Sequence, residues 1–230
     1  MNNQIFTWKG QEWQTEERWG DMHPDKPWAR YSSDCVKINK KDELELSVGN
    51  FVDGAFNMGL VSTTANNCKF SYGTYSFIAK LPRGKNLWPA LWMWSWDSWP
   101  PELDVMEAWT NKCGGYKLTS GLSHITNCVH WNESNFHKPN FLKFGKLFPF
   151  HLPQYTFNVY SMLWKPDLIA FFFNGKMIST FTDKEALEWI NNHNKNGMNI
   201  IMNLYPTKDY KKGDMKSPLI IRDFHYDPLY

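Results

Sequence analysis

The sequence is poor in arginine and nearly neutral in charge. Only four of its 25 basic residues are arginines, and 23 acidic residues leave a formal net charge of +2. Proteins that bind nucleic acid carry an excess of positive charge, and forked arginine side chains are the usual partners of phosphates and bases. The composition therefore argues against nucleic acid as a partner.

Long apolar runs and metal-type cysteine spacings are also missing. No apolar stretch approaches the ~20 residues of a membrane-spanning helix, so we expect no membrane association. The N-terminal stretch MNNQIFTWKG lacks the charged start and apolar run of a signal peptide. No C-x-x-C pair is present, which argues against zinc. The four cysteines could form two disulfides, in three alternative pairings, or stay reduced: Cys35, Cys68, Cys113 and Cys128.

Aromatic residues, by contrast, are abundant. The chain has 13 tryptophans, 10 tyrosines and 16 phenylalanines in 230 residues. A core needs mainly aliphatic side chains, so part of this excess has a second use, and flat rings that stack on a ligand are one such use. No repeat, low-complexity tract or linker interrupts residues 1–230, so we predict one domain, and we also expect a monomer.

Most of the chain has the pattern of short strands separated by clusters of Gly, Pro, Asn and Asp. The clearest candidates are Glu43–Val48, Gly73–Leu81, Trp88–Trp94, Leu103–Trp109, Lys117–Thr126, Tyr155–Trp164, Leu168–Asn174 and Met198–Leu204. The segments YTFNVYSMLW and LIAFFFNGKMI, separated by Lys-Pro-Asp, are predicted to form a hairpin, and the pair Asn174-Gly175 predicts a second tight turn into Lys176–Phe181. Asn135–Phe150 and Thr207–Ser217 are predicted as long loops. These features predict an all-β fold, a two-sheet antiparallel β-sandwich of jelly-roll type.

One short helix is predicted near the C-terminal end of this pattern. Thr182 and Glu185 have the spacing of a capping box at its start. Ala186, Leu187 and Ile190 then form a short apolar stripe at helical spacing.

The segment WPPELDVMEAW (Trp99–Trp109) places three carboxylates among apolar residues. Side chains alternate along a strand, so Glu102 and Asp104 share one face. Strict alternation would send Glu107 to the opposite, apolar face, where an unpaired carboxylate is costly. One extra residue, a β-bulge at Val105–Met106, restores the parity and places all three acids on one open face.

Three carboxylates this close cannot all ionise, so at least one is expected to titrate well above an ordinary glutamate. Glycoside hydrolysis needs two carboxyls in different protonation states, because an ionised carboxylate attacks the anomeric carbon while a protonated carboxyl donates to the leaving oxygen. Two pleats and a bulge bring two such groups to roughly the 5–5.5 Å separation of retaining enzymes. A solvated acidic face and a calcium site are the alternative interpretations of an acid-rich strand.

The hexapeptide ELDVME (Glu102–Glu107) resembles the E-[ILV]-D-x-x-E signature of glycoside hydrolase family sixteen, in the bulged form typical of laminarinases, agarases and carrageenases. Further segments are similar to blocks of that family over nearly the whole chain: YGTYSFIAKLPRGKNLWPALWMW, SGLSHIT, YSMLWKPDLIAFFFNGKMI, NIIMNLYP and LIIRDFHY. Some positions depart from the family pattern and leave the substrate open. Ser76–Lys80 lacks a common arginine, Pro101 replaces a glycine, and Leu163 replaces a glutamate.

The resemblance implies a concanavalin-like β-jelly roll with an open concave cleft for sugars. It also implies an endo-acting, retaining O-glycosyl hydrolase of a β-linked polysaccharide. Carried over by position, Glu102 is expected to be the nucleophile and Glu107 the acid/base. Asp104, between them, is expected to hydrogen-bond the nucleophile and hold its charge state.

The candidate substrate-binding residues are mostly aromatic, because an indole ring can cover the apolar face of a sugar. Trp92 and Trp99 match family aromatics on either side of the scissile bond, and His124 matches the histidine of the family's cleft. Trp88 shares a strand face with Trp92, and Trp109 follows the acidic segment by two residues. Asn203 and Asn57 are further polar candidates for binding sugar hydroxyls. Trp94 is left open between core and cleft, and His130 has no assigned role.

The function favoured by these observations is retaining endo-hydrolysis of a β-1,3- or mixed-linkage glucan. A marine or sulphated β-galactan (agar, porphyran or carrageenan) is the alternative substrate, and a non-catalytic lectin on the same sandwich is the alternative function. The predicted reaction requires no cofactor, although many relatives hold a calcium ion on the convex side, where Asp223 would be a ligand. Family members are usually secreted or periplasmic, whereas this chain shows no signal peptide, so the compartment stays open.

Overall fold

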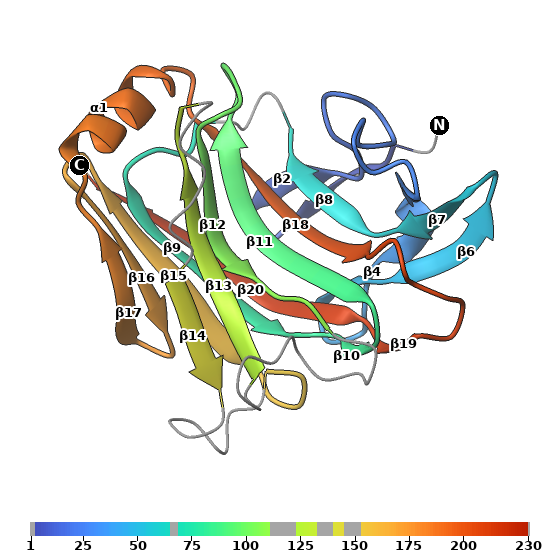
Figure 1. The fold of residues 1–230 in the computed structure, drawn as a ribbon. Helices are drawn as coiled ribbons and strands as arrows, with labels where there is room; N and C mark the ends of the chain where they lie inside the picture. Colours follow the sequence, from blue (N-terminus) through green and yellow to red (C-terminus); the bar gives the residue numbers. More distant parts are fainter. Residues whose placement is uncertain (1–2, 65–68, 111–122, 133–139, 145–152, 230) are drawn as a thin grey trace.

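The computed structural model describes residues 3–64, 69–110, 123–132, 140–144 and 153–229, with only the backbone described at 123–124 and 140–144. Within these ranges the chain forms two large antiparallel sheets that face each other (Figure 1). The eight-stranded sheet contains, in spatial order, β1 (Ile5–Trp8), β2 (Gln11–Gln14), β8 (Leu60–Thr63), β18 (Met198–Pro206), β11 (Leu87–Ser95), β12 (Glu102–Glu107), β13 (Ser123–His130) and β14 (Asn140–Phe144).

The seven-stranded sheet contains, in spatial order, β17 (Lys176–Phe181), β16 (Leu168–Phe173), β15 (Asn158–Lys165), β9 (Gly73–Lys80), β20 (Leu219–Pro228), β5 (Leu44–Leu46) and β4 (Val36–Ile38). Two smaller sheets consist of β3 (Ala29–Tyr31), β7 (Ala55–Met58) and β6 (Val48–Val52), and of β10 (Arg83–Gly84) and β19 (Met215–Ser217). A short 3₁₀ helix spans Ser33–Cys35.

The core lies between the two large sheets. Strands β9 and β15 bury every second residue, as expected when only one face of a sheet is covered, and thereby place Tyr75, Phe77 and Trp164 in the core. Leu91 and Met93 of β11 approach from the other sheet. Burial of this apolar surface is the main favourable contribution to folding. The antiparallel two-sheet sandwich predicted from the strand pattern is confirmed.

The predicted hairpins are also confirmed. Strands β15 and β16 pair antiparallel around Pro166 and Asp167. Asn174 and Gly175 then have φ values of 49° and 76°, and β17 follows directly. Positive φ at both central residues is typical of the tight hairpin turn that Asn-Gly favours.

The predicted helix is present as α1 (Lys184–Asn192), at one end of the sandwich (Figure 1), and it buries Ala186, Leu187 and Ile190. The predicted cap at Thr182 is wrong by one residue, because Asp183 Oδ1 accepts the backbone N–H of Ala186 at 3.1 Å. An aspartate is as good an N-cap as a threonine and stands at the position with access to that amide. In the described ranges, no helix is long and apolar enough to cross a membrane.

Other boundaries differ where pairing partners are distant in sequence. The predicted loops Asn135–Phe150 and Thr207–Ser217 contain strands β14 and β19, because β13 and β10 offer them edges to pair with. The predicted strand Glu43–Val48 is broken at Ser47, whose backbone N–H donates to Cys35 at 3.0 Å instead of to a ladder partner. Of the predicted strand Lys117–Thr126, the part before residue 123 lies outside the described residues.

Candidate active site

A β-bulge in β12 determines which way the acidic side chains point. Along β11, Leu91 pairs with Met106 and the next residue, Trp92, pairs with Asp104, so Val105 has no opposite residue. Val105 and Met106 are consequently both buried in the core, with exposed fractions of 1% and 0%. The bulge expected at these two positions is confirmed, and it turns the following Glu107 to the outer face of the sheet.

The bulge has a partner that the sequence did not indicate. Asn127 of β13 is 2% exposed, and its Nδ2 donates to the backbone carbonyl of Val105 at 2.5 Å. A carbonyl displaced from the strand ladder would otherwise be buried without a donor, which is costly. Asn127 therefore stabilises the irregular backbone that orients the acids.

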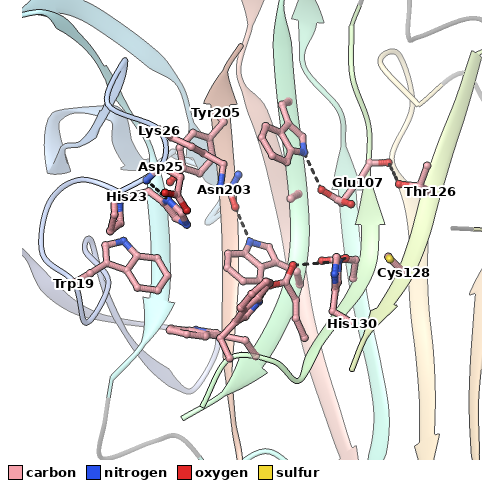
Figure 2. Close-up of a pocket in the computed structure, with 18 of the residues that line it drawn as sticks. Trp19, His23, Asp25, Lys26, Glu107, Thr126, Cys128, His130, Asn203 and Tyr205 are labelled. Carbon is pink, nitrogen blue, oxygen red and sulfur yellow. Dashed lines mark hydrogen bonds and ion pairs between the residues drawn. The ribbon is translucent and has the colours of Figure 1, made fainter. Parts of the chain in front are cut away.

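Glu102, Asp104 and Glu107 line a cleft of about 790 Å³ on the outer face of the eight-stranded sheet. Figure 2 shows Glu107 on one side of the cleft, across from Trp19 and Lys26 of an N-terminal segment. The three predicted catalytic acids are thus brought together at one surface.

Glu107 is the acid with a pKa near neutrality. Burial, and after it the negative charge of Glu102, raise its pKa to about 7. Trp88 Nε1 donates to Glu107 Oε1 at 2.9 Å, which stabilises the ionised form and limits the rise. A carboxyl in this range can both give and take a proton near neutral pH.

Asp104 lies beneath the two glutamates and is only 1% exposed. Burial raises its pKa well above the usual range of an aspartate, and the charges of Glu107 and Glu102 act in the same direction. Its Oδ2 forms a hydrogen bond of 3.0 Å with His130 Nε2. Asp104 therefore favours the protonated form in this structure.

Glu102 has a different environment from the other two acids. Trp99 Nε1 donates to its Oε2 at 2.6 Å, and His130 Nε2 lies 3.6 Å from its Oε1. An indole N–H can only donate, so this contact stabilises a carboxylate that accepts. Glu102 thus accepts a hydrogen bond from Trp99, while His130 Nε2 lies nearer to Asp104, at 3.0 Å.

His130 is a residue of the site whose role the sequence analysis did not resolve. It pairs with Glu102 across the β12–β13 ladder and contacts two of the three acids. Burial lowers its pKa, but the hydrogen bond with Cys128 and the charges of Glu102 and Glu107 outweigh burial, so its pKa is raised. The predicted cleft histidine, His124, pairs through its backbone with Lys143, and its side chain lies outside the described residues.

The predicted tryptophans are placed in the cleft. Trp88 stacks on Trp109, with ring centroids 5.5 Å apart and planes at 29°. Trp92 Nε1 donates to Asn203 Oδ1 at 2.6 Å, so this predicted polar residue also lines the cleft and orients the indole. Trp99 is 44% exposed at the rim.

Two of the remaining candidates are less available to a sugar. Trp94 lines the cleft but is 2% exposed, and the Arg18 guanidinium lies 3.9 Å from its ring centroid. Asn57 lies in β7, opposite Arg30, and is not among the residues that line the cleft.

The opposite wall of the cleft comes from the N-terminal segment 18–26, which no motif indicated. Trp19 packs on His23, with centroids 5.1 Å apart, and burial lowers the pKa of His23 to about 4, so its ring is neutral. Lys26 Nζ lies 5.3 Å from the ring centroid of Trp88 and 5.4 Å from that of Tyr205, within the range of cation–π attraction. This wall forms only when a distant part of the chain folds over the sheet.

Metal-ligating side chains gather at one place in the described part of the chain. Ligand atoms of Asp104, Cys128 and His130 lie within 4.8 Å of one another. Asp223 does not belong to this cluster, and its Oδ1 accepts the backbone N–H of Phe224 at 3.0 Å. Neither observation tests the calcium ion expected at Asp223, which stays a prediction. Cys35 and Cys128 are buried thiols, whereas Cys68 and Cys113 lie outside the described residues.

An antiparallel sandwich whose cleft is lined by carboxylates and walled by tryptophans offers the two kinds of group that recognise and cleave carbohydrate, paired carboxyls and flat apolar rings. The model of "Glycosyl hydrolases family 16" matches residues 25–217, and the chain belongs to this family. The family resemblance noted from the acidic segment is thereby confirmed.

The curated relatives match this chain over only a part of their own length. The chain is 31% identical over 167 residues to the glucan endo-1,3-beta-glucosidase A1 of Niallia circulans, covering 69% of this chain and 19% of that protein. It is 38% identical over 74 residues to the beta-1,3-glucan-binding protein of Penaeus monodon, covering 30% and 19%. The chain thus spans about a fifth of the length of these relatives.

The fold is shared with solved structures at lower identity. The laminarinase of Flavobacterium sp. UMI-01 superposes with a TM-score of 0.69 and 18% identity, over 87% of this chain and 85% of that chain. At this identity the likeness shows the sandwich fold alone, in agreement with the sheet topology described above.

Proposed function

We propose that the protein is an endo-acting hydrolase of β-1,3- or mixed-linkage glucan that retains the anomeric configuration. Glu102 is the nucleophile and Glu107 the acid/base. The observation that carries this proposal is the bulge, which directs Glu107 into the cleft that Glu102 also lines while leaving the two carboxyls in different electrostatic surroundings.

The reaction proceeds in two displacements. In the first, the Glu102 carboxylate attacks the anomeric carbon, the glycosidic C–O bond breaks, and Glu107 gives its proton to the departing oxygen. In the second, Glu107 takes a proton from water, whose oxygen attacks the same carbon and releases Glu102. Two inversions at one carbon give net retention. The pKa of about 7 for Glu107 suits a group that must act first as acid and then as base.

Asp104 and His130 position the nucleophile rather than react. A protonated Asp104 can donate to Glu102, and this hydrogen bond is among the interactions that raise the pKa of Asp104. His130, 3.0 Å from Asp104 and 3.6 Å from Glu102, holds the pair from the neighbouring strand. Together they keep the attacking oxygen oriented, which lowers the entropic cost of reaching the transition state.

The substrate class is proposed from the cleft walls and from the named relatives. Trp92 and Trp99 present indole rings to the cleft, and such rings bind the apolar C–H faces of glucose units. The Niallia circulans relative is named a glucan endo-1,3-beta-glucosidase, and its matched part covers most of this chain. A β-1,3-glucan such as laminarin is therefore the first substrate to test.

The experiment has two parts. Reducing ends are measured on laminarin, lichenan, agarose, carrageenan and xyloglucan, and the anomer first formed from the cleaved substrate is read by proton NMR. Release of reducing ends with the β-anomer first supports the proposal, whereas an initial α-anomer contradicts the role of Glu102 as nucleophile.

The two roles are separated with alanine variants, azide and an activated aryl glycoside. Azide attacking in place of Glu102, in Glu102→Ala, gives the inverted α-glycosyl azide. In Glu107→Ala, azide resolves the covalent intermediate and gives the β-glycosyl azide. The opposite assignment of products would exchange the two roles.

A non-catalytic glucan-binding module is the second candidate function. It is favoured by one observation, the match to a Penaeus monodon protein named a beta-1,3-glucan-binding protein. Tight laminarin binding with no new reducing ends from any of the polysaccharides would select it. The raised pKa of Glu107 has no use in such a module.

An anionic galactan is the alternative substrate, and the cations on the cleft wall favour it. Arg18 and Lys26 both line the cleft. Cleavage of carrageenan in preference to laminarin, lost on Lys26→Met, would select this substrate class.

A further inference from the structure

A group of three metal-type ligands lies beside the catalytic acids. Strand alternation places Cys128 and His130 of β13 on the cleft face, two residues apart. Across the ladder, Asp104 is the direct partner of Cys128, and such cross-strand pairs stand ~5 Å apart at Cβ. Ligand atoms of the three side chains lie within 4.8 Å of one another, and Figure 2 shows Cys128 and His130 close together on this wall.

We propose that Asp104, Cys128 and His130 form an inhibitory binding site for a thiophilic divalent cation, with Zn²⁺ as the ion that fits best. Zinc takes sulfur, imidazole nitrogen and carboxylate oxygen in tetrahedral geometry, with bonds of about 2.0–2.3 Å. Neighbouring ligand atoms then stand ~3.5 Å apart. Asp104 Oδ2 and His130 Nε2 are already 3.0 Å apart, so small side-chain rotations would complete the set.

The ligand types select the cation. Calcium and magnesium prefer sets made of oxygen, and a set that includes a thiol and an imidazole matches zinc and its softer neighbours. All three side chains line the cleft, so an ion reaches them from solvent, and the fourth ligand position is left to water. On binding, the Cys128 thiol releases its proton to solvent and coordinates as thiolate. The absence of a C-x-x-C pair does not bear on this site, because its ligands come from two strands.

The surrounding charge also favours a cation. Glu102 lies 3.6 Å from His130, and Glu107 is close enough for its charge to raise the pKa of Asp104. Opposite charges attract strongly where solvent is largely excluded. Cys35 is not among the residues that line the cleft, and its thiol lies beside Ser47 and Gly49.

Binding there stops the reaction that we propose, and this part of the inference rests on the proposed function. The ion would draw Asp104 and His130 away from Glu102 and place positive charge next to the attacking carboxylate. A nucleophile paired with a cation is less able to attack the anomeric carbon. Zinc is therefore expected to inhibit reversibly, with full activity restored by a chelator.

Direct binding is tested first, without any substrate. Co²⁺, which accepts the same ligands, is titrated into the wild-type protein, and the near-ultraviolet thiolate-to-cobalt absorption is followed. We expect this band with one ion per chain in the wild type and in Cys35→Ser. In Cys128→Ser the affinity should fall by at least the roughly 10–100-fold that loss of even an outer partner costs. An unchanged band in Cys128→Ser would assign the metal to another cysteine and overturn the proposal.

Inhibition is tested second, as the ratio of the initial rates of each protein with and without Zn²⁺. We expect a fall of about tenfold or more in wild type and Cys35→Ser, reversed by EDTA, with Mg²⁺ as an inactive control. In Cys128→Ser the ratio should stay near one. Equal inhibition of all three proteins contradicts the site. The matched variant Cys128→Ala replaces Cys128→Ser if the latter does not fold, as judged by its thermal melting.

The two tests separate this inference from the proposed function. If the wild type hydrolyses no polysaccharide, the cobalt titration still reports whether the three residues bind a metal. If the wild type is active and no cobalt band forms, the metal site alone is rejected.

Discussion

Two glutamates with raised pKa values have different surroundings. Glu17 is 2% exposed and its pKa is raised to about 8, while Glu107 has a pKa of about 7, with burial as the largest cause for both. Both Glu17 oxygens accept from Asn199 Nδ2, at 3.3 and 3.4 Å, and Glu17 does not line the cleft. Glu107 lines the cleft together with Glu102.

The comparison shows that a raised pKa by itself reports burial. Chemistry needs two further conditions, a path to substrate and a second carboxyl with a different charge state. Only Glu107 meets both. Substitutions at the two glutamates should therefore have opposite consequences for activity and for stability.

The largest effect is expected on activity. Glu107→Gln should lower kcat by about 10²–10⁴-fold, because it removes the group that donates and accepts the proton. Glu17→Gln, the matched control, should keep kcat within about twofold, because this residue does not line the cleft. Initial rates on laminarin measure both. Equal losses in the two variants would mean that burial, not access to the cleft, determines the effect.

The second prediction concerns stability. The folded pKa of Glu17 lies above its unfolded value of 4.5, so the contribution of Glu17 is fully present below about pH 4.5 and is lost as the pH rises towards 8. The wild-type free energy of unfolding should therefore fall with pH in this window. In Glu17→Gln, the decrease in the free energy of unfolding between pH 5 and 8 should be smaller than in the wild type by about 3 kcal/mol. Urea unfolding at several pH values measures this, and parallel curves for the two proteins would contradict it.

The third prediction separates shape from charge at Asp104. Because Asp104 favours the protonated form, Asp104→Asn keeps its shape and a donor, and should cost little more than a few-fold in kcat. Asp104→Ala removes the hydrogen bond to an ionised partner, worth about 1.5–3 kcal/mol, and should cost roughly 10–100-fold. The kcat values of the two variants test this. A larger loss in the asparagine variant would mean that Asp104 acts as a charge.

The smallest effect is expected for the contact between Trp88 and Glu107. Trp88→Phe removes the N–H that stabilises ionised Glu107, so the pKa of Glu107 rises above about 7. The acid/base must be protonated for the first step, so the alkaline limb of the kcat profile should move up by about 0.7 pH unit, equivalent to one hydrogen bond. Trp109→Phe, at the stacked partner, should leave the limb in place.

Local sequence patterns were enough to predict the bulge in the acidic strand and the hairpins. The Asn174-Gly175 turn follows from the positive φ that these residues tolerate, and the bulge follows from the cost of burying Glu107 between Val105 and Ala108. Both arguments need only neighbouring residues, because period and parity are properties of a single strand. The predicted helix cap was wrong by one residue, because the adjacent polar side chains of Thr182 and Asp183 compete for the same backbone amides.

Residues that join the site from other strands could not be placed in this way. His130 contacts Glu102 only through the register between β12 and β13, and Asn127 reaches the bulge by the same register. Lys26 approaches Trp88 across the cleft from the N-terminal segment. Neither register nor loop closure has a local signal in one sequence.

The sequence by itself determined the alternation of side chains along the strands, the extra residue that forms the bulge in the acidic strand, the aromatic content and the family. The tertiary structure decided the chemistry of each acid. A pKa depends on which charges and donors stand within a few ångströms, and for Asp104 and Glu107 these include groups from β11, β13 and the N-terminal segment. The same long-range packing assembled the Asp104, Cys128 and His130 cluster, because only strand pairing brings residues 24 and 26 positions apart into contact.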